Sequence, residues 1–232
     1  MNNVDIGIIG AMQPEIEELT SSLTDSYTEC IGGIEFFVGT LGKKRAVIAR
    51  CGIGKVFAAM CAEAMIIRYS PRLIINTGVG GALKKGIKPL DVVVADELCQ
   101  HDMDTSALGD PKGLVSGINT VYFRTDERAT ALAKQIARNM GIAAHGGIIA
   151  SGDKFVASAE DKARIVSDFS ASACEMEGAA IAHVAFVNAT PCCVIRAISD
   201  SADEGSSMDY MKFLPLAASN CARITKELSQ LY

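Results

Sequence analysis

The chain has 232 residues, of which 49% are hydrophobic, and a formal net charge of −5 at pH 7. This acidic balance argues against a nucleic-acid-binding or anionic-membrane surface, because both need a basic patch. No apolar run approaches the roughly 18–20 residues of a membrane span, and residues 1–5 lack the basic start of a secretory signal. We therefore expect a cytoplasmic protein with one domain over residues 1–232.

Apolar strands and helices are predicted to alternate along the chain, and three consecutive strands form a meander, so the sheet is expected to be mixed. Pro14 fits the start of the first helix, where its missing N–H needs no partner. The predicted strands cover residues 4–10, 28–32, 34–41, 44–51, 72–77, 90–95, 145–150 and 192–198, and another ends near residue 175. The predicted helices cover residues 14–23, 56–69, 125–140, 160–169, 178–189 and 209–231.

Eight cysteines are many for this length, but none is spaced Cys-x-x-Cys. The adjacent Cys192 and Cys193 fall in a predicted strand, where successive side chains point to opposite faces. We expect reduced thiols in the core, and neither a zinc site nor a disulfide framework.

Ligand-type residues follow the ends of five predicted strands. In an open α/β sheet, ligands gather at the carboxyl ends of the strands. These residues are therefore expected to meet at one rim: Glu15, Ile53-Gly54, Gly78 to Gly81, Phe155-Val156 and Ser199-Asp200.

Two carboxylates, Glu175 and Glu177, stand directly before the predicted helix 178–189. One interpretation is structural, because acidic residues favour the positive N-terminal end of a helix. The same interpretation applies to Glu15, and Asp200 could begin a turn. The alternative is a site in which the helix and the next strand, with Arg196 in it, bring these acids to one rim.

Neither glycine-rich turn matches a cofactor motif. Gly52 to Lys55 is not a P-loop, because Ala49 and Val56 stand where Gly and Ser or Thr are needed. Gly78 to Gly81 lacks the third glycine of a dinucleotide fingerprint, since position 83 is Leu. We therefore expect no cofactor.

The segment His101-Asp102-Met103-Asp104 has two interpretations. It could ligate a metal, or it could be a turn with Asp caps and a hydrogen-bonded histidine. The chain has only three histidines, and nothing pairs them at ligand spacing, so no metal is expected. Residues 109–119 are rich in Gly, Pro and Ser and are predicted to form a mobile loop.

Several short segments, each weak alone, occur together in one order along nearly the whole chain. They are Gly7-Ile8-Ile9-Gly10-Ala11-Met12 with Glu15, Gly52-Ile53-Gly54-Lys55-Val56, Ile75-Asn76-Thr77-Gly78, Ser151-Gly152-Asp153, Glu175-Met176-Glu177 and Arg196-Ala197-Ile198-Ser199-Asp200. The set resembles the nucleoside phosphorylase and hydrolase superfamily, and within it the 5′-methylthioadenosine/S-adenosylhomocysteine nucleosidases.

This resemblance implies an α/β fold, a three-layer αβα sandwich with a central mixed β-sheet, and a homodimer. It implies hydrolysis of the N-glycosidic bond of 5′-methylthioadenosine, S-adenosylhomocysteine and related 5′-substituted adenosines, with release of adenine in methionine salvage. Breaking that bond creates positive charge on the sugar and negative charge on the base. Such a reaction needs an acid at the base, a carboxylate near the sugar and a held water molecule.

The resemblance also implies residue roles. Asp200 would protonate adenine N7, Glu15 would position the water, and Glu177, with Met176 alongside, would bind the ribose hydroxyls. The other substrate-binding residues are expected to be Phe155, stacked on the base; Val156, reading its edge through the backbone; Met12, Ile53 and Tyr210, in the alkylthio pocket; and Gly78, Glu175, Arg196 and Ser199.

The chain departs from this family at a few positions. Val79 stands where relatives commonly have Ser, and Thr105, Leu108 and Ser116 stand where relatives tend to be bulkier or more apolar. A futalosine-type nucleoside hydrolase is therefore an alternative. The others are a nucleoside phosphorylase of the same fold, which would need cationic phosphate ligands, and a non-catalytic nucleoside-binding protein.

Overall fold

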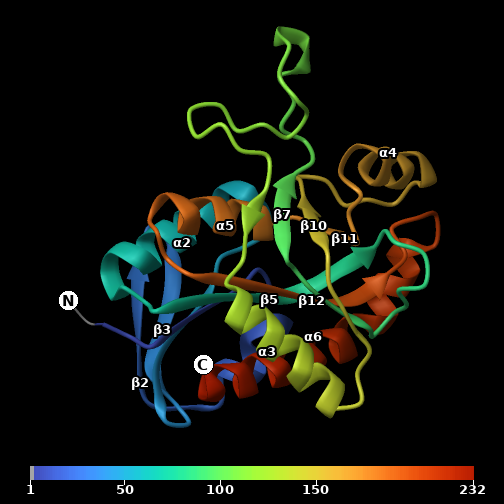
Figure 1. The fold of residues 1–232 in the computed structure, drawn as a ribbon. Helices are drawn as coiled ribbons and strands as arrows, with labels where there is room; N and C mark the ends of the chain where they lie inside the picture. The colour runs from blue at the N-terminus through green and yellow to red at the C-terminus, as the bar shows by residue number, and fades with distance from the viewer. Residues whose placement is uncertain (1–2) are drawn as a thin grey trace.

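Within residues 3–232, which the computed structural model describes, twelve strands form one sheet (Figure 1). The strands are β1 (Ile6–Gly10), β2 (Leu23–Ile31), β3 (Ile34–Leu41), β4 (Lys44–Arg50), β5 (Leu73–Ala82), β6 (Val92–Val94), β7 (Glu97–Gln100), β8 (Phe123–Arg124), β9 (Ala144–His145), β10 (Ile148–Ser151), β11 (Ala173–Glu175) and β12 (Cys192–Asp200). The helices are α1 (Gln13–Thr20), α2 (Lys55–Tyr69), the short 3-10 helix η1 (Ser106–Leu108), α3 (Glu127–Asn139), α4 (Ala159–Phe169), α5 (Gly178–Val187) and α6 (Ser206–Leu231).

The sheet is mixed, as the sequence predicts. β2, β3 and β4 form an antiparallel meander, whereas β1 runs parallel to both β4 and β5. β12 is also parallel to β5, and β11 is antiparallel to β5. The carboxyl ends of β1, β5 and β12 therefore lie along one edge of the sheet, where ligands gather in such folds.

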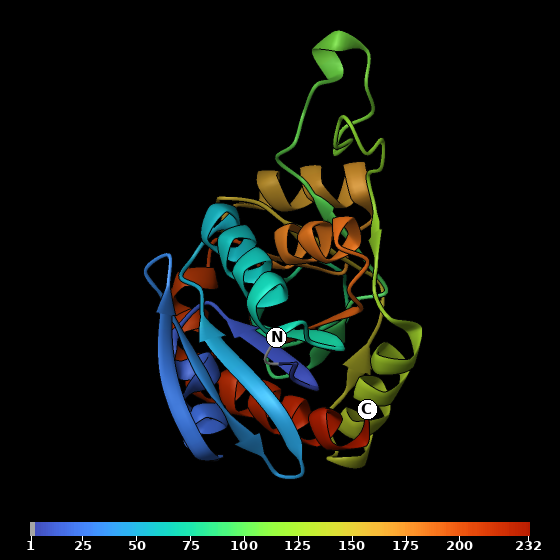
Figure 2. The same cartoon turned by 90° about the vertical axis from the view of Figure 1, so that its left-hand side faces the viewer.

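Helices cover both faces of the sheet and give three layers (Figures 1 and 2). One hydrophobic core joins α2 and α5 to the sheet, and a second joins α1, α3 and α6 to its other face. Successive side chains of β12 point to the two cores in turn. Cys192 and Val194 lie in the first core, and Cys193 and Ile195 lie in the second. The predicted opposite orientation of the two cysteines is confirmed.

Local sequence signals set several helix ends. Asp126 precedes α3 and caps it by accepting a hydrogen bond from the Ala129 amide at 2.8 Å. α2 ends at Ser70, which adopts a left-handed conformation with φ of 45° directly before Pro71. Asp126 thus marks the start of α3, and Ser70 with Pro71 marks the end of α2.

The predicted strand at residues 72–77 is too short. β5 continues through Gly78 to Gly81, where a turn was predicted, and ends at Ala82. The glycines allow neighbouring strands to approach, because a Cβ on Gly80 would lie 2.9 Å from the Cys174 carbonyl oxygen. This extension carries the backbone of β5 into the candidate site.

Other predicted boundaries are wrong because their strands carry a weak apolar pattern. β2 begins at Leu23, five residues before the predicted start, and most of its side chains are exposed. β7 and β8 were not predicted, and residues 145–150 are divided into β9 and β10 at Gly147. Backbone pairing with neighbouring strands defines these elements more than their own sequence does.

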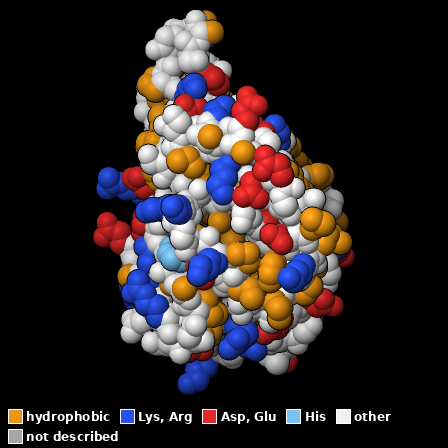
Figure 3. Space-filling view, turned by 90° about the vertical axis from the view of Figure 1, so that its right-hand side faces the viewer, with side chains coloured by type: hydrophobic (Ala, Val, Ile, Leu, Met, Phe, Trp, Pro, Cys, Tyr) orange, Lys and Arg blue, Asp and Glu red, His pale blue; other side chains and the backbone are white. Residues whose placement is uncertain are grey.

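Residues 101–122, between β7 and β8, form a protrusion whose outer part extends away from the body of the protein (Figure 1), and Figure 3 shows the protrusion at the top of the molecule. Its tip is η1, where Leu108 is 84% exposed. Across the described residues, no helix is long and apolar enough to cross a membrane.

Candidate active site

A pocket opens at the carboxyl ends of β1, β5, β11 and β12. Loops after β1, β4 and β10 and the start of α6 complete its wall. It is lined by Ala11, Met12, Glu15, Ile53, Val79, Gly80, Gly81, Lys154, Phe155, Val156, Cys174, Glu175, Met176, Glu177, Ser199, Asp200 and Tyr210.

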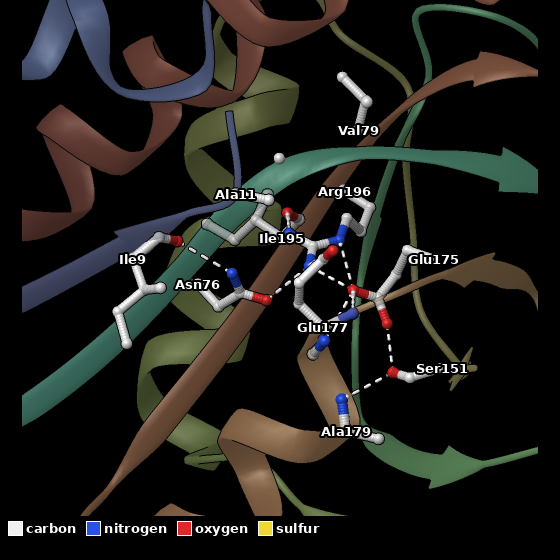
Figure 4. Close-up of polar contacts among 12 residues, drawn as sticks. Ile9, Ala11, Asn76, Val79, Ser151, Glu175, Glu177, Ala179, Ile195 and Arg196 are labelled. Carbon is white, nitrogen blue, oxygen red and sulfur yellow. Dashed lines mark hydrogen bonds and ion pairs between the residues drawn. The ribbon is translucent and has the colours of Figure 1, made fainter. Parts of the chain in front are cut away.

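The buried Arg196 guanidinium contacts the Glu175 carboxylate and lies near that of Glu177 (Figure 4). Its Nε lies 3.1 Å from Glu175 Oε2, and its Nη2 donates to the same oxygen and, at 2.6 Å, to Asn76 Oδ1. Asn76 in turn donates to the Ile9 carbonyl at 2.9 Å, which ties β1, β5 and β12 together. A buried arginine needs such partners, because an unpaired buried charge is strongly unfavourable.

Glu175 organises the start of α5. Its Oε2 accepts the amides of Glu177 at 3.0 Å and Gly178 at 2.7 Å, and its Oε1 accepts the Ser151 hydroxyl. Burial acts to raise the pKa of Glu175, but Arg196 and these donors outweigh burial and hold the pKa below its ordinary value. The helix N-terminal interpretation is therefore correct for Glu175, which also lines the pocket.

Glu177 has a different environment. Its Oε1 accepts the Gly54 amide at 2.9 Å, its Oε2 lies 3.8 Å from Arg196, and it makes no side-chain cap to α5. Burial, and after it the charge of Glu175, raise the pKa of Glu177 to about 8. The two neighbouring acids thus have pKa values shifted in opposite directions, a pattern typical of active sites.

Glu15 is buried and its carboxylate accepts three backbone amides. They belong to Ala11 at 2.8 Å, Met12 at 2.9 Å and Val79 at 3.0 Å. Burial raises the pKa of Glu15, although Arg196 and the three amides act in the opposite direction. Glu15 therefore caps α1, as one interpretation proposed, and also faces the pocket.

Asp200 ends β12, and only 2% of the residue is exposed. Its Oδ2 accepts the Ser199 hydroxyl at 2.8 Å, and its Oδ1 accepts the Ala202 amide at 2.9 Å. The Ala202 contact is the turn-forming bond that the structural interpretation proposed. Both residues also line the pocket.

The mouth of the pocket is apolar. The Tyr210 hydroxyl donates to Met12 Sδ at 3.2 Å, and the Tyr210 ring meets the Phe155 ring edge to face with centroids 5.6 Å apart. Phe155 and Ile53 are both partly open to solvent. The pocket therefore combines an apolar and aromatic wall with four acids, Glu15, Glu175, Glu177 and Asp200.

Two predicted binding residues, Gly78 and Arg196, are outside the lining of the pocket. A Cβ on Gly78 would lie 2.5 Å from Glu15 Oε1 and 2.8 Å from Arg196 Nη1. Gly78 thus leaves room for these side chains to approach each other. Arg196 acts on the pocket through Glu175, since its guanidinium faces that carboxylate.

Some lining residues were not predicted as site residues. They are Ala11, Lys154 and Cys174. Val79, Gly80 and Gly81 also line the pocket, and they belong to the segment Gly78 to Gly81 that was expected at the rim, although as a turn and not as part of a strand. Cys174 and Lys154 directly adjoin predicted site residues in sequence, which is the only signal that could have identified them.

The segment from His101 to Asp104 is a turn, and Asp104 accepts the Ser106 amide at 2.9 Å. The prediction of a hydrogen-bonded histidine is wrong, because neither ring nitrogen of the buried His101 has a partner among residues 3–232. Its ring packs against Gly152, where a Cβ would lie 2.4 Å from His101 Nε2. Among the described residues, no group of three or more His, Cys, Asp or Glu side chains is placed to hold a metal ion.

Comparison with known proteins identifies similar chains over nearly the full length. A model of the phosphorylase superfamily matches residues 5–230. A 5′-methylthioadenosine/S-adenosylhomocysteine nucleosidase of Actinobacillus succinogenes is 40% identical over 228 residues, covering 97% of this chain and 99% of the relative. An aminodeoxyfutalosine nucleosidase of Helicobacter pylori is 39% identical over 224 residues, covering 96% of each chain.

The fold is similar to that of a solved relative. A crystal structure of the Neisseria meningitidis 5′-methylthioadenosine/S-adenosylhomocysteine nucleosidase in complex with methylthio-immucillin-A gives a TM-score of 0.95 at 39% identity. The likeness covers 98% of this chain and 99% of that one. The predicted α/β class with a central mixed sheet is confirmed.

Proposed function

The chain belongs to the phosphorylase superfamily, and on that premise we propose that it hydrolyses the N-glycosidic bond of 5′-methylthioadenosine, S-adenosylhomocysteine and related 5′-substituted adenosines, releasing adenine. One observation carries this proposal. Glu15, Glu177 and Asp200 come from three separate elements and line one pocket with an aromatic mouth. Three carboxyl groups match the three tasks of N-ribosyl hydrolysis.

In the proposed reaction, a water oxygen forms a bond to C1′ of the ribose while the C1′–N9 bond breaks. The electron pair of the broken bond goes to adenine, and Asp200 supplies the proton that N7 takes up. Glu15 accepts a proton from the water, and its raised pKa makes it a stronger base than an ordinary carboxylate. The donors from Ala11, Met12 and Val79 keep the Glu15 carboxylate oriented.

Glu177 is proposed to bind the ribose hydroxyls and to favour the positively charged sugar. Both tasks use the ionised carboxylate, because only that form accepts from two hydroxyls and attracts the cation. With a pKa of about 8, this form becomes populated as the pH rises. The value of kcat/KM is therefore expected to fall as the pH decreases below about 8.

The cations near the pocket favour hydrolysis over phosphorolysis. Arg196 is committed to Glu175 and Asn76, and Lys154 pairs with Asp161 at 2.6 Å. A phosphate dianion beside the sugar would instead need free cationic donors, and it would be repelled by Glu15.

A second substrate is supported by a specific observation. The Helicobacter pylori relative described as an aminodeoxyfutalosine nucleosidase is about as similar to this chain as the methylthioadenosine nucleosidases are. The mouth of the pocket is apolar and open, so a larger 5′-substituent could extend past Ile53 and Phe155. We propose the aminodeoxyfutalosine-type nucleosides as the runner-up substrate.

We also propose a homodimer in the cytoplasm. Large apolar side chains remain exposed on α2 and α5, which lie side by side (Figure 2), and the most exposed of them are Val56, Ile67, Phe186 and Val187. Such a face suits an interface with a second copy, which would also cover the exposed Leu108 of the protrusion. A reducing compartment suits eight unpaired thiols.

The test is adenine release by the purified protein in phosphate-free buffer, with 5′-methylthioadenosine, S-adenosylhomocysteine and aminodeoxyfutalosine as separate substrates. We expect adenine and a free ribosyl product from the first two substrates. A kcat/KM highest for aminodeoxyfutalosine would select the runner-up substrate. Binding of all three without adenine release would identify a non-catalytic nucleoside-binding protein.

A further inference from the structure

Three segments around the pocket are joined by a ring of hydrogen bonds that uses none of the pocket's lining residues. The Lys55 amide donates to Asp153 Oδ1 at 2.8 Å, and the Asp153 amide donates to Asp102 Oδ2 at 2.9 Å. The Lys55 ammonium closes the ring on Asp102 Oδ1 at 2.5 Å and also reaches Gln100 Oε1 at 3.2 Å. We call Lys55, Asp102 and Asp153 the bridge.

Two members of the bridge adjoin lining residues of the pocket, and the third adjoins the protrusion. Lys55 follows Gly54, whose amide donates to Glu177, and Ile53, which lines the pocket. Asp153 precedes the lining residues Lys154, Phe155 and Val156. Asp102 lies at the base of the protrusion of residues 101–122.

The conformation of Gly54 needs such support. Its φ of 101° and ψ of 163° lie in a region that only glycine adopts readily, and its amide must still reach Glu177 Oε1. A Cβ on Gly54 would lie 3.0 Å from Asp153 Oδ1, so the bridge packs directly against this residue. Two successive amides are therefore held, because Glu177 accepts the Gly54 amide and Asp153 accepts the Lys55 amide.

The bridge pairs the positive charge of Lys55 with the negative charge of Asp102. Burial acts to raise the pKa of Asp102, but the Lys55 ammonium and the Asp153 amide outweigh burial and hold the pKa below its ordinary value. Asp102 therefore accepts both donors as an ionised carboxylate, and charge-assisted bonds of this kind are short and directional. The Lys55 side chain is 17% exposed, so water competes weakly with this contact.

We propose that Lys55, through Asp102 and Asp153, is a positioning residue that holds the Gly54 amide against Glu177 and the Phe155 segment against the pocket. This inference rests on the proposed function for its kinetic consequence. Its geometric consequence, the fixed Gly54 amide, is independent of which nucleoside the protein cleaves.

The test uses Lys55→Met, which keeps the aliphatic stem and the backbone donor to Asp153 but removes the ammonium. Lys134→Met is the matched control, because Lys134 also pairs with an aspartate at 2.5 Å, is 18% exposed and is not a lining residue of the pocket. Two quantities are measured for both variants. They are the hydrogen-exchange rate of the Gly54 amide, and the pH profile of kcat/KM with 5′-methylthioadenosine.

In Lys55→Met we expect the Gly54 amide to exchange about tenfold faster than in the unmodified protein. We expect kcat/KM to fall by up to about 10²-fold, as small misplacements in an active site produce. Burial, Glu175 and Glu15 raise the pKa of Glu177, whereas Arg196 and the Gly54 amide lower it. Loss of the Gly54 contact should therefore move the acidic limb of the profile to higher pH. Lys134→Met should change none of these.

Unchanged Gly54 exchange in Lys55→Met would overturn the proposal whatever the activity is. If the Gly54 amide exchanges faster but neither kcat/KM nor the acidic limb of its pH profile changes, the positioning role is wrong. If the unmodified protein released no adenine, the proposed function would fail, and the exchange rates would still decide whether the bridge fixes Gly54. Asp102→Asn in the Lys55→Met background should add little to either effect, because both changes break the same ring.

Discussion

Asp200 and Glu177 are both buried acids at the pocket, but their neighbours give them different tasks. Asp200 accepts a hydroxyl and an amide at the end of β12, whereas Glu177 accepts a single amide and faces Arg196 at 3.8 Å. The first is held at the place proposed for the leaving base, and the second at the place proposed for the sugar. Each proposal can be tested by replacing a carboxyl with an amide of nearly equal size.

Asp200→Asn is expected to lower kcat by about 10²–10⁴-fold, the usual range for loss of a general acid. The melting temperature should change little, because Asn retains an acceptor for the Ala202 amide. Steady-state adenine release and thermal unfolding measure the two effects. Near-normal turnover in a folded Asp200→Asn protein would leave Asp200 with only its turn-forming contact, and Asp203→Asn serves as the neighbouring control.

Glu177 makes the stability of the protein depend on pH. Its pKa is raised from 4.5 in the unfolded reference to about 8 in the folded protein. Below pH 4.5 the carboxyl is protonated in both states, and as the pH rises from 4.5 to 8 the unfolded state alone releases the proton. Ionisation of Glu177 therefore destabilises the fold progressively across this window.

Glu177→Gln lacks this ionisation and is expected to unfold at a higher temperature than the unmodified protein. Because of the linkage, the difference in melting temperature should grow from pH 4.5 to pH 8 and then stay level. Thermal unfolding of both proteins across that range measures it. A difference that is the same at every pH would show that the pKa of Glu177 is not raised by folding.

At the scale of elements, the extension of β5 beyond residue 77 supplies backbone to the site. Gly78 leaves room for the side chains of Glu15 and Arg196 to approach each other, and Val79 donates its amide to Glu15. A side chain at Gly78 would have to displace one of two buried charged groups. β5 is therefore proposed to position Glu15 as much as α1 does.

Gly78→Ala is expected to reduce kcat/KM by about 10²-fold, because small displacements of a catalytic group have effects of this size. The added Cβ meets Glu15 Oε1 at 2.5 Å and Arg196 Nη1 at 2.8 Å. Gly205→Ala is the control, since its nearest neighbour would lie at 3.9 Å. Equal kcat/KM in both variants, measured by adenine release, would contradict the proposed positioning of Glu15 by β5.

The sequence predicted the elements whose pattern is strong. Apolar sequence identifies three strands as strands, namely β3, β4 and β12, which begins at Cys192. The cap at Asp126 identifies the start of α3. β2 pairs with the adjacent β3 but carries mostly exposed side chains, whereas β7 and β8 pair with each other across the protrusion, so local pattern could not define these strands. The glycines of β5 indicate a turn by composition, and only their strand neighbours make them extended.

The same distinction holds for the candidate site. Acids at the ends of predicted strands could be identified because topology alone brings strand ends together. Other contacts link segments far apart in the sequence. Arg196 contacts Glu175, and the bridge joins Lys55 to Asp102 and Asp153. Arg196 and Glu175 were identified as candidate site residues, but no local signal distinguishes Lys55, Asp102 and Asp153 from solvated charged residues.

At the scale of the whole molecule, the exposed apolar side chains of α2 and α5 predict a second copy. Light scattering of active protein is expected to give twice the 24.5 kDa mass of the chain. Phe186→Asp should dissociate the dimer, because Phe186 is 57% exposed on that face. Leu231→Asp is the control, at 51% exposure on the end of α6. A mass near 24.5 kDa for the unmodified, active protein would reject the homodimer.

The central claim is that this member of the phosphorylase superfamily uses water where a phosphorylase uses phosphate. Its pocket acids favour water, and its nearest cations, Arg196 and Lys154, are already paired. The most direct measurement is the rate of adenine formation from 5′-methylthioadenosine as phosphate is added, with the sugar product identified by NMR. We predict the same rate with and without phosphate and a free methylthioribose product. A rate that requires phosphate, with a ribose 1-phosphate as product, would contradict the account.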